Sequence, residues 1–111
     1  MEKPSPSANS DSGLTPDDFV GGVLDVVASI PAGRVMSYGQ VAATIGSRSA
    51  RGVGRVMAHH GDEVPWWRVV RAGGLPPSCH EAEALEHYRA EATPMAPRAD
   101  GSYRLAASAF V

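Results

Sequence analysis

The amino-acid sequence predicts a single domain that is mostly α-helical with short β segments. Two observations support this prediction: apolar residues recur at helical spacing in several stretches, and capping signals open those stretches. The 111 residues are enough for one modest hydrophobic core. No apolar run is long enough to span a bilayer and no signal-peptide pattern opens the chain, so we expect no membrane partner. The single cysteine, Cys79, excludes an internal disulfide and suits a cytoplasmic location.

The N-terminal third is predicted to hold a leader and one helix. Residues 1–14 are rich in Ser, Pro, Asn and Gly, which is typical of a disordered segment. Thr15 as N-cap, followed by Pro16, predicts the start of a helix. The helix ends at residues 31–33, Pro-Ala-Gly. Its predicted core face consists of Phe19, Val23, Val26, Val27 and Ile30.

Two short helices joined by a tight turn predict a helix-turn-helix. A short strand is expected at Val35 and Met36. Ser37 and Gln40 then form a capping-box pattern for a helix that runs to about residue 45, with Gly46 at its C-terminus. Ser47 or Ser49 opens the next helix, which reaches about residue 60.

The helix that ends near residue 60 has two distinct faces. At 100° per residue, Val53, Val56 and Met57 share one face, and the opposite face holds Arg48, Arg51, Arg55 and His59. Gly52 and Gly54 lie at the borders, where each weakens the helix by about 1 kcal/mol relative to alanine. Either a nucleic-acid groove or a tightly packed neighbouring helix would explain two glycines here.

The remaining chain is predicted to add a strand, a turn and a fourth helix. Val69 and Val70 form the strand, and with the turn at residues 71–74 they would make a small wing. A second capping box, Ser78 to Glu81, opens a helix that Pro94 ends. Its apolar stripe is Ala82, Leu85, Tyr88 and Ala92. Residues 95–111 are a C-terminal extension with a turn at Asp100-Gly101 and a short strand over Tyr103, Arg104 and Leu105.

Positive charge is concentrated in the middle of the chain. The formal net charge is -2, yet residues 34–71 hold six arginines against Asp62 and Glu63. Such a patch is expected on a protein that binds a polyanion. From charge alone, a solvated arginine face with no partner is equally consistent.

Three segments resemble the O6-alkylguanine-DNA alkyltransferases, in that family's order and spacing. Residues 30–42 resemble the entry into its helix-turn-helix, and residues 49–57 resemble its recognition helix. Residues 65–70, Pro-Trp-Trp-Arg-Val-Val, resemble its active-site strip, with Trp66 at the place of the nucleophilic cysteine and Trp67 at that of the histidine. Tryptophan in place of the cysteine is the mark of the alkyltransferase-like proteins, which bind alkylated guanine and cannot take the alkyl group. The predicted fold is therefore this family's winged helix-turn-helix-like domain over residues 15–94.

The resemblance implies how DNA would be bound. The family's recognition helix lies in the minor groove, where small residues such as Ala50 permit close contact. Arg51 matches the arginine that fills the space left by a flipped nucleotide, and Tyr38 matches a tyrosine that rotates the lesion's phosphate. A half-buried core ring is the alternative role of Tyr38. The predicted DNA-binding residues are Ser37, Tyr38, Ala50, Arg51, Gly52, Gly54, Arg55 and Arg71.

The tryptophan pair is predicted to border a pocket for the extruded base. Trp66 offers a flat ring on which a base can stack, and one N–H donor. Adjacent residues on an extended strip face opposite ways, so one of the two rings is expected in the core. Trp66 is the choice for the pocket; Trp67 either packs under the helix-turn-helix or widens the pocket wall. Arg68 braces the loop or binds phosphate. The predicted lesion pocket comprises Tyr38, Pro65, Trp66, Trp67 and Arg68.

The sequence thus predicts a non-enzymatic DNA-damage recognition protein with no catalytic residue, cofactor or metal. Its expected partners are double-stranded DNA containing O6-alkylguanine and the nucleotide excision repair proteins to which the lesion is flagged, and it is expected to be a monomer. Three alternatives remain. These are a winged-helix regulator that reads the major groove, an active alkyltransferase that uses Cys79, and a protein-interaction module without a DNA role.

Overall fold

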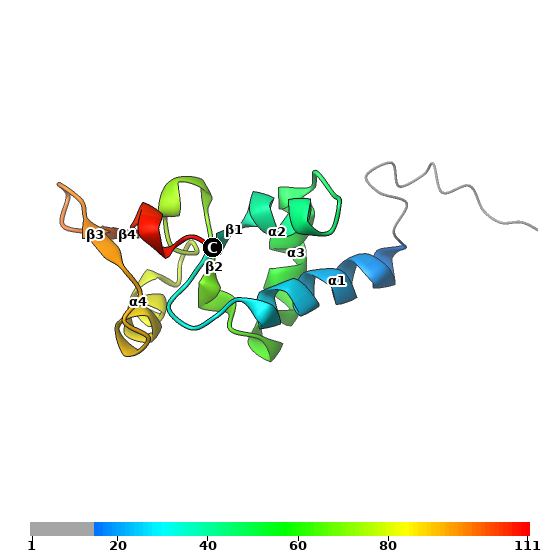
Figure 1. Ribbon diagram of the computed structural model, residues 1–111, viewed down its shortest axis with the longest axis horizontal. Coiled ribbons are helices and arrows are strands. Elements are labelled where there is room, and N and C mark those ends of the chain that lie inside the picture. Colours follow the sequence, from blue (N-terminus) through cyan, green and yellow to red (C-terminus); the bar gives the residue numbers. More distant parts are fainter. Residues whose placement is uncertain (1–14) are drawn as a thin grey trace, which may run out of the picture.

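The computed structural model describes residues 15–111, so the predicted leader lies outside the described residues. Within this range, four α-helices are joined by short 3₁₀ turns and two small sheets. The first three helices pack together at one end of the fold, and α4 with the β3–β4 hairpin lies at the other (Figure 1). None of the helices in this part of the chain is long and apolar enough to cross a membrane.

Helix α1 (Pro16–Ser29) forms as predicted. The Thr15 side-chain oxygen accepts a hydrogen bond from the Asp18 amide at 3.0 Å, which satisfies an amide that has no partner within the helix. Val23, Val27 and Ile30 are buried, and the other two predicted core residues of this helix pack against them as half-buried side chains. One apolar stripe therefore attaches α1 to the rest of the fold.

The helix-turn-helix is formed by α2 (Tyr38–Thr44) and α3 (Ala50–His60). The predicted capping box is present: Ser37 Oγ accepts the Gln40 amide at 3.1 Å, and Gln40 Oε1 accepts the Ser37 amide at 2.8 Å. Ser49, one of the two serines considered, caps α3 by accepting the Gly52 amide at 2.9 Å. Gly46, at a φ of +77°, lies in the turn between the two helices.

The predicted wing does not form. Strand β2 (Val69–Val70) pairs in parallel with β1 (Met36–Ser37), which lies one residue later than expected. The predicted turn after β2 is present and is closed by a hydrogen bond from the Arg71 amide to the Leu75 carbonyl at 2.8 Å, but no strand in residues 15–111 returns along β2. Residues 72–74 form a 3₁₀ turn, and a side chain on Gly74 would lie 2.5 Å from the Leu105 carbonyl oxygen. Glycine at this position therefore allows the turn to pack against β4, so that it does not project as a wing.

Helix α4 (Glu81–Ala90) differs from the prediction at both ends and in its buried face. No Ser78 capping box forms, because Cys79 has a φ of +69° and His80 is the N-cap, without a side-chain cap bond. The helix ends at residue 90, well before Pro94. Ala84 and Tyr88 are the buried residues, spaced one turn apart, whereas Ala82 and Ala92 of the predicted stripe are exposed.

The C-terminal extension contains a hairpin. The predicted strand β4 (Tyr103–Leu105) is confirmed and pairs antiparallel with β3 (Met95–Pro97), a strand that was not predicted. The chain end then returns to the middle of the fold, where Val35 and Phe110 form an isolated parallel bridge (Figure 1). The first core cluster lies among α1, α2 and α3, and the second is formed by Val35, Val70, Ala84, Tyr88, Leu105 and Ala109.

Candidate nucleic-acid interface and adjoining cavity

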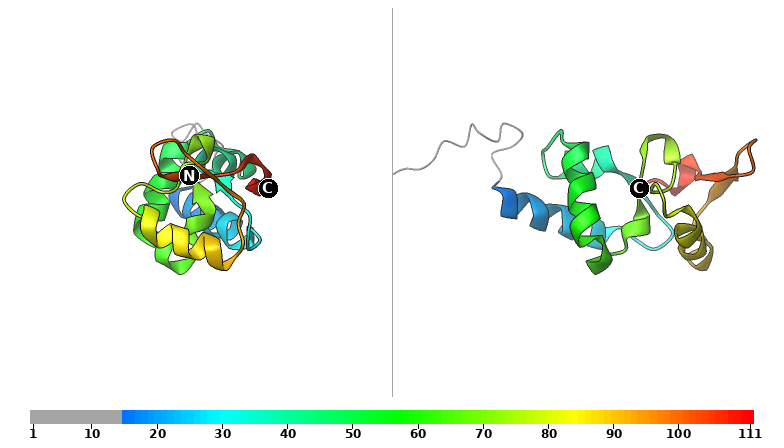
Figure 2. Two further views of the ribbon diagram at one scale, coloured as in Figure 1. Left: turned by 90° about the vertical axis from the view of Figure 1, so that its left-hand side faces the viewer. Right: turned by 180° about the vertical axis from the view of Figure 1, so that it is seen from behind.

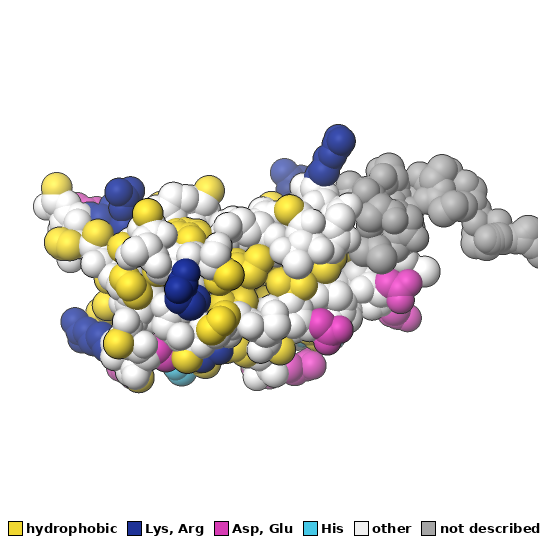
Figure 3. All heavy atoms as spheres, viewed as in Figure 1, with side chains coloured by type: hydrophobic (Ala, Val, Ile, Leu, Met, Phe, Trp, Pro, Cys, Tyr) yellow, Lys and Arg dark blue, Asp and Glu magenta, His cyan; other side chains and the backbone are white. Residues whose placement is uncertain are grey.

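Helix α3 presents an exposed basic face. Arg51 and Arg55 are exposed, together with Arg48 and His59, while Val53 and Val56 on the opposite side are buried. The helix runs along the surface in the right-hand view of Figure 2. Acidic side chains instead gather over α1 (Figure 3). The two-faced character predicted for this helix is confirmed, and it leaves a basic surface suited to a polyanion.

The arginines of the middle segment divide into two groups. Arg34, Arg68 and Arg71 each donate side-chain hydrogen bonds to backbone carbonyls of other segments, so they brace the fold. Arg48, Arg51 and Arg55 make no side-chain hydrogen bond or ion pair with any residue in the range 15–111. Within residues 34–71, the positive charge that is not engaged inside the fold therefore lies on and just before α3.

The two glycines of α3 have different surroundings. A side-chain carbon on Gly52 would lie 2.7 Å from Ser49 Oγ and 3.0 Å from the Phe19 ring, so tight packing against α1 accounts for this glycine. A carbon on Gly54 would meet no atom within 4 Å. Gly54 is thus the glycine that leaves the helix backbone open to an approaching molecule. The DNA contact assigned to Gly52 stays a prediction.

A cavity of about 530 Å³ lies beside Gly54. Its size falls in the ~300–1,000 Å³ range of small-molecule sites. One wall comes from α3 and the turn after it, and the other from the segment that leads into α4. The lining residues are Tyr38, Gly54, Met57, Ala58, Gly61, Asp62, Trp66, Arg71, Pro77, Ser78, His80 and Glu83.

Tyr38 and Arg71 meet at this cavity. Tyr38 packs against the helical core as a half-buried ring and also lines the cavity. Its role in rotating the lesion's phosphate stays a prediction. Burial raises the pKa of the Tyr38 hydroxyl, and the nearby Arg71 charge opposes that rise. The neutral phenol can therefore donate a hydrogen bond at physiological pH. Arg71 Nε is held by the Pro76 carbonyl at 2.8 Å.

Trp66 contributes an indole ring to the cavity wall. Its ring is half-buried and lies 5.7 Å, centroid to centroid, from the rings of Trp67, His80 and His87. The contacts to Trp67 and His87 are edge-on, at 87° and 81°. These neighbours fix the orientation of the Trp66 ring beside the cavity.

Trp67 does not line the cavity. Its ring stacks on His87 with the centroids 3.7 Å apart and the planes at 6°, and its Nε1 donates to Glu91 Oε2 at 3.1 Å. As expected, only one of the two rings lines the cavity, but the stated reason, an extended strip, is wrong. Residues Trp66–Arg68 form a 3₁₀ turn, not an extended strip, and Trp67 packs against α4 rather than under the helix-turn-helix.

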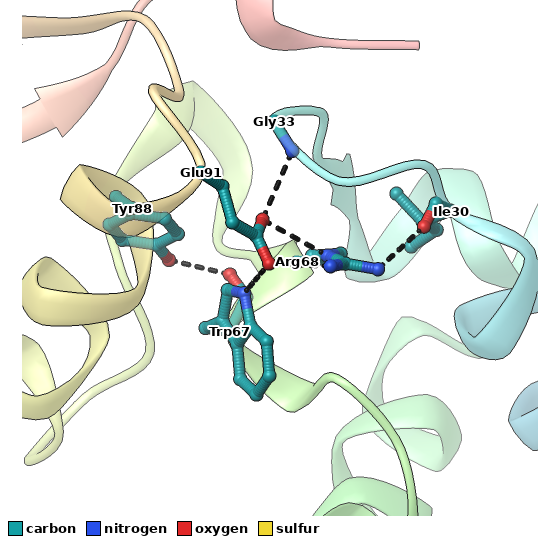
Figure 4. Close-up of polar contacts among 6 residues, drawn as sticks. All are labelled: Ile30, Gly33, Trp67, Arg68, Tyr88 and Glu91. Carbon is teal, nitrogen blue, oxygen red and sulfur yellow. Dashed lines mark hydrogen bonds and ion pairs between the residues drawn. The ribbon is translucent and has the colours of Figure 1, made fainter.

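Arg68 also points away from the cavity. Its Nη1 donates to the Ile30 carbonyl at 2.9 Å, and its Nε donates to Glu91 Oε1 at 3.1 Å (Figure 4). The side chains of Arg68 and Glu91 are 16% and 13% exposed. Of the two roles considered for Arg68, the structure supports the brace. Pro65 is likewise absent from the cavity lining and is the residue before the 3₁₀ turn.

Glu91 is a residue beside the tryptophan strip that the sequence did not indicate. Its carboxylate also accepts the Gly33 amide at 3.0 Å, so it joins the loop after α1 to the tryptophan strip (Figure 4). Burial acts to raise the pKa of Glu91, but hydrogen bonds from Arg68, Gly33 and Trp67 outweigh it and hold the pKa below its ordinary value. A single glutamate near a helix end carries no sequence signal for contacts 23 and 58 residues away.

The remaining candidates lie as follows. The Ser37 hydroxyl is used as the cap of α2, and Ala50 is the first residue of α3. Cys79 is exposed and is not among the residues that line the cavity, although its neighbours Ser78 and His80 are. Between residues 15 and 111, no three His, Cys, Asp or Glu side chains are grouped so that they could hold a metal ion.

Comparison with known proteins agrees with this arrangement. The family described as "6-O-methylguanine DNA methyltransferase, DNA binding domain" matches residues 18–92. Alkyltransferase-like protein 1 of Schizosaccharomyces pombe is 44% identical over 61 residues, which cover 52% of this chain and 56% of that protein. The DNA base-flipping protein of Escherichia coli is 46% identical over 61 residues, covering 52% and 47%. The matched segment thus spans about half the length of these relatives.

Solved structures extend the similarity over most of the fold. The crystal structure of S. pombe Atl1 in complex with damaged DNA containing O6-carboxymethylguanine has a TM-score of 0.73 and 33% sequence identity. That match covers 84% of this chain and 93% of the other. A second Atl1 complex with DNA matches with the same TM-score at 32% identity. The helix-turn-helix, the tryptophan strip and α4 all lie within the matched family region, and the chain belongs to the family of the 6-O-methylguanine DNA methyltransferase DNA-binding domain.

Proposed function

We propose that this protein recognises O6-alkylguanine in duplex DNA by flipping the base out of the helix, without removing the alkyl group. The proposal rests on the position of the Trp66 ring. This ring lines a cavity next to the exposed basic face of α3. By the resemblance of residues 65–70 to the family's active-site strip, Trp66 stands where alkyl-transferring members carry their nucleophilic cysteine. Stacking of a base on an aromatic ring is worth about 1–3 kcal/mol. An apolar O6-alkyl group adds further surface to bury.

The α3 surface provides the approach to DNA. In the proposed complex the helix lies in the minor groove, with the open backbone at Gly54 against the groove and Arg55 close to the phosphates. Arg51 is exposed and makes no side-chain bond within the described part of the chain, so its planar guanidinium is free to enter the base stack. An extruded nucleotide would then reach the cavity beside Gly54, where Tyr38 can donate a hydrogen bond.

The cavity offers no means of alkyl transfer to a cysteine. That reaction requires a nucleophile and a base that activates it. Trp66 and Trp67 carry neither group, and Trp67 is committed to Glu91 and His87. Cys79 lies on the exposed loop before α4, outside the cavity lining. These placements support recognition without catalysis.

If the protein binds a lesion without repairing it, other proteins must carry out the repair. We infer that the bound complex flags the site for nucleotide excision repair proteins, and that the protein acts as a monomer in the cytoplasm, associated with the nucleoid when bound. The support is the family membership.

The proposal is tested with two duplexes that are identical except for one O6-methylguanine. Equilibrium binding of the purified protein is measured for both at the same salt concentration, because phosphate contacts make affinity strongly salt-dependent. Lesion recognition requires tighter binding of the modified duplex. Equal binding of both duplexes would contradict it, and a footprint confined to one sequence regardless of alkylation would favour a major-groove regulator.

A further inference from the structure

The cavity beside Trp66 carries an excess of negative charge. Among its lining residues, the carboxylates of Asp62 and Glu83 stand against the single guanidinium of Arg71. Two acidic residues thus line the space that would receive an extruded base, whereas the α3 surface proposed to meet the DNA is basic. The charge of the lining is therefore opposite in sign to that of the α3 surface.

The one positive charge in the lining is already engaged. Arg71 Nε donates to the Pro76 carbonyl at 2.8 Å, and its Nη2 lies 3.8 Å from a carboxylate oxygen of Glu81. Glu81 lies at the start of α4, outside the cavity lining. Arg71 is therefore partly neutralised before any ligand enters, which leaves less positive charge to attract an anion.

The two carboxylates are more available than Arg71. Asp62 makes no side-chain hydrogen bond or ion pair with any residue between 15 and 111. Among residues 15–111, the Glu83 carboxylate has one polar side-chain partner, His80 Nδ1, at 2.9 Å. The Glu83 side chain is 69% exposed. His80 is also a ring neighbour of Trp66, at 5.7 Å between centroids. A base stacked on Trp66 would therefore lie in a cavity whose lining includes the acidic residues Asp62 and Glu83.

We propose that this cavity selects O6 adducts by charge, accepting neutral or cationic alkyl groups and discriminating against those that carry a carboxylate. The inference rests on the proposed function, because it concerns the base that the cavity receives. Asp62 and Glu83 are its specificity-determining residues. They repel an anionic substituent, whereas an uncharged group of the same shape escapes that repulsion.

The test uses pairs of modified bases that differ in charge and little in size. Otherwise identical duplexes carry guanine, O6-methylguanine, O6-carboxymethylguanine, its uncharged amide O6-carbamoylmethylguanine, or the cationic O6-(2-aminoethyl)guanine. O6-carboxymethylguanine is an informative probe because the related Atl1 has been crystallised with DNA that contains it. The measured quantity is the ratio of dissociation constants for the carboxylate and amide duplexes, in which contacts to the common phosphates cancel.

We expect the amide to bind about threefold to tenfold more tightly than the carboxylate, a modest factor because the two acids are largely solvated. The aminoethyl duplex should bind at least as tightly as the amide. In the double variant Asp62→Asn, Glu83→Gln, the ratio should fall towards one. Glu86→Gln makes the same change on an exposed residue of α4 that does not line the cavity, and it should leave the ratio unchanged.

The outcomes separate the two proposals. If the wild-type protein prefers O6-methylguanine over guanine but binds the carboxylate and the amide equally, charge selection is wrong while lesion recognition stands. If the ratio persists in the double variant, Asp62 and Glu83 do not determine it. If no modified duplex is preferred over guanine, the proposed function fails and charge selection fails with it.

Discussion

Trp66 and Trp67 lie edge to face, with their ring centroids 5.7 Å apart and their planes at 87°. This geometry gives adjacent residues separate roles. Trp66 borders the cavity, whereas Trp67 is fixed by its stack on His87 and its hydrogen bond to Glu91. In the proposed complex, the ring that receives the base is thus supported by a ring that is fixed against α4.

The role of Arg51 predicts a difference between two substitutions. Arg51→Ala should weaken binding of the O6-methylguanine duplex by about 1–3 kcal/mol, because the stacking partner in the vacated space is lost. Arg51→Lys keeps the charge but not the planar fork, so it should retain most of the salt dependence and still lose affinity for the lesion. Binding isotherms at several salt concentrations distinguish the two effects. Wild-type affinity in Arg51→Ala would refute the base-flipping role.

The two glycines of α3 form a matched pair of tests. Gly54→Ala should raise the free energy of unfolding by about 0.5–1 kcal/mol, because alanine favours a helix and the added carbon meets nothing. It should nevertheless weaken DNA binding, since the methyl group occupies the surface that approaches the groove. Gly52→Ala should lower thermal stability, because its carbon would displace the Ser49 cap and the Phe19 ring. Thermal unfolding and duplex binding of both variants give the comparison. Unchanged binding in Gly54→Ala would place the groove elsewhere.

Glu91 predicts a pH-dependent stability. Its pKa is lowered in the folded protein, so its contribution is fully present above the ordinary glutamate value of 4.5 and is lost as the pH falls through the folded value. Glu91→Gln should reduce the free energy of unfolding at neutral pH by roughly 2–4 kcal/mol, because Arg68 is left without its counter-charge. The deficit should shrink below pH 4.5, where the wild type also loses the interaction. A difference that stays constant from pH 7 to the acid range would show that the carboxylate charge is not responsible.

Cys79 should be irrelevant to lesion binding. Incubation with the O6-methylguanine duplex should add no methyl group to the protein, as measured by intact mass, and Cys79→Ser should bind that duplex like the wild type. The reason is that the thiol lies outside the cavity on an exposed loop. Methyl transfer that is lost in Cys79→Ser would instead establish the alkyltransferase alternative.

Local signals predicted the N-terminal half of the fold well. Capping at Thr15 and Ser37, and the two faces of α3, depend on residues within a few positions of each other, so the pattern alone reveals them. The second half depended on distant contacts. The wing was wrong because β2 pairs with β1, more than 30 residues earlier, and the α4 cap was wrong because Cys79 adopts a left-handed conformation.

In the candidate site, too, some residues could be predicted from the sequence and others depend on distant contacts. Trp66, Tyr38 and Arg71 were named from the sequence, and the structure brings them together at one cavity. Arg68 and Trp67 were also named, but both donate hydrogen bonds to Glu91 and do not line the cavity. The acids of the cavity wall, Asp62 and Glu83, come from separate turns and carry no motif, so only the tertiary fold reveals that they share a space with Trp66.

The most direct test of the central claim is the lesion preference of Trp66→Ala. The preference is the ratio of dissociation constants for the guanine duplex and the matched O6-methylguanine duplex, measured beside the wild type at one salt concentration. The account predicts that the wild type prefers the lesion and that Trp66→Ala loses about 1–3 kcal/mol of that preference, while its binding to the guanine duplex changes little. A Trp66→Ala variant that keeps the full preference would contradict the assignment of this cavity as the lesion pocket.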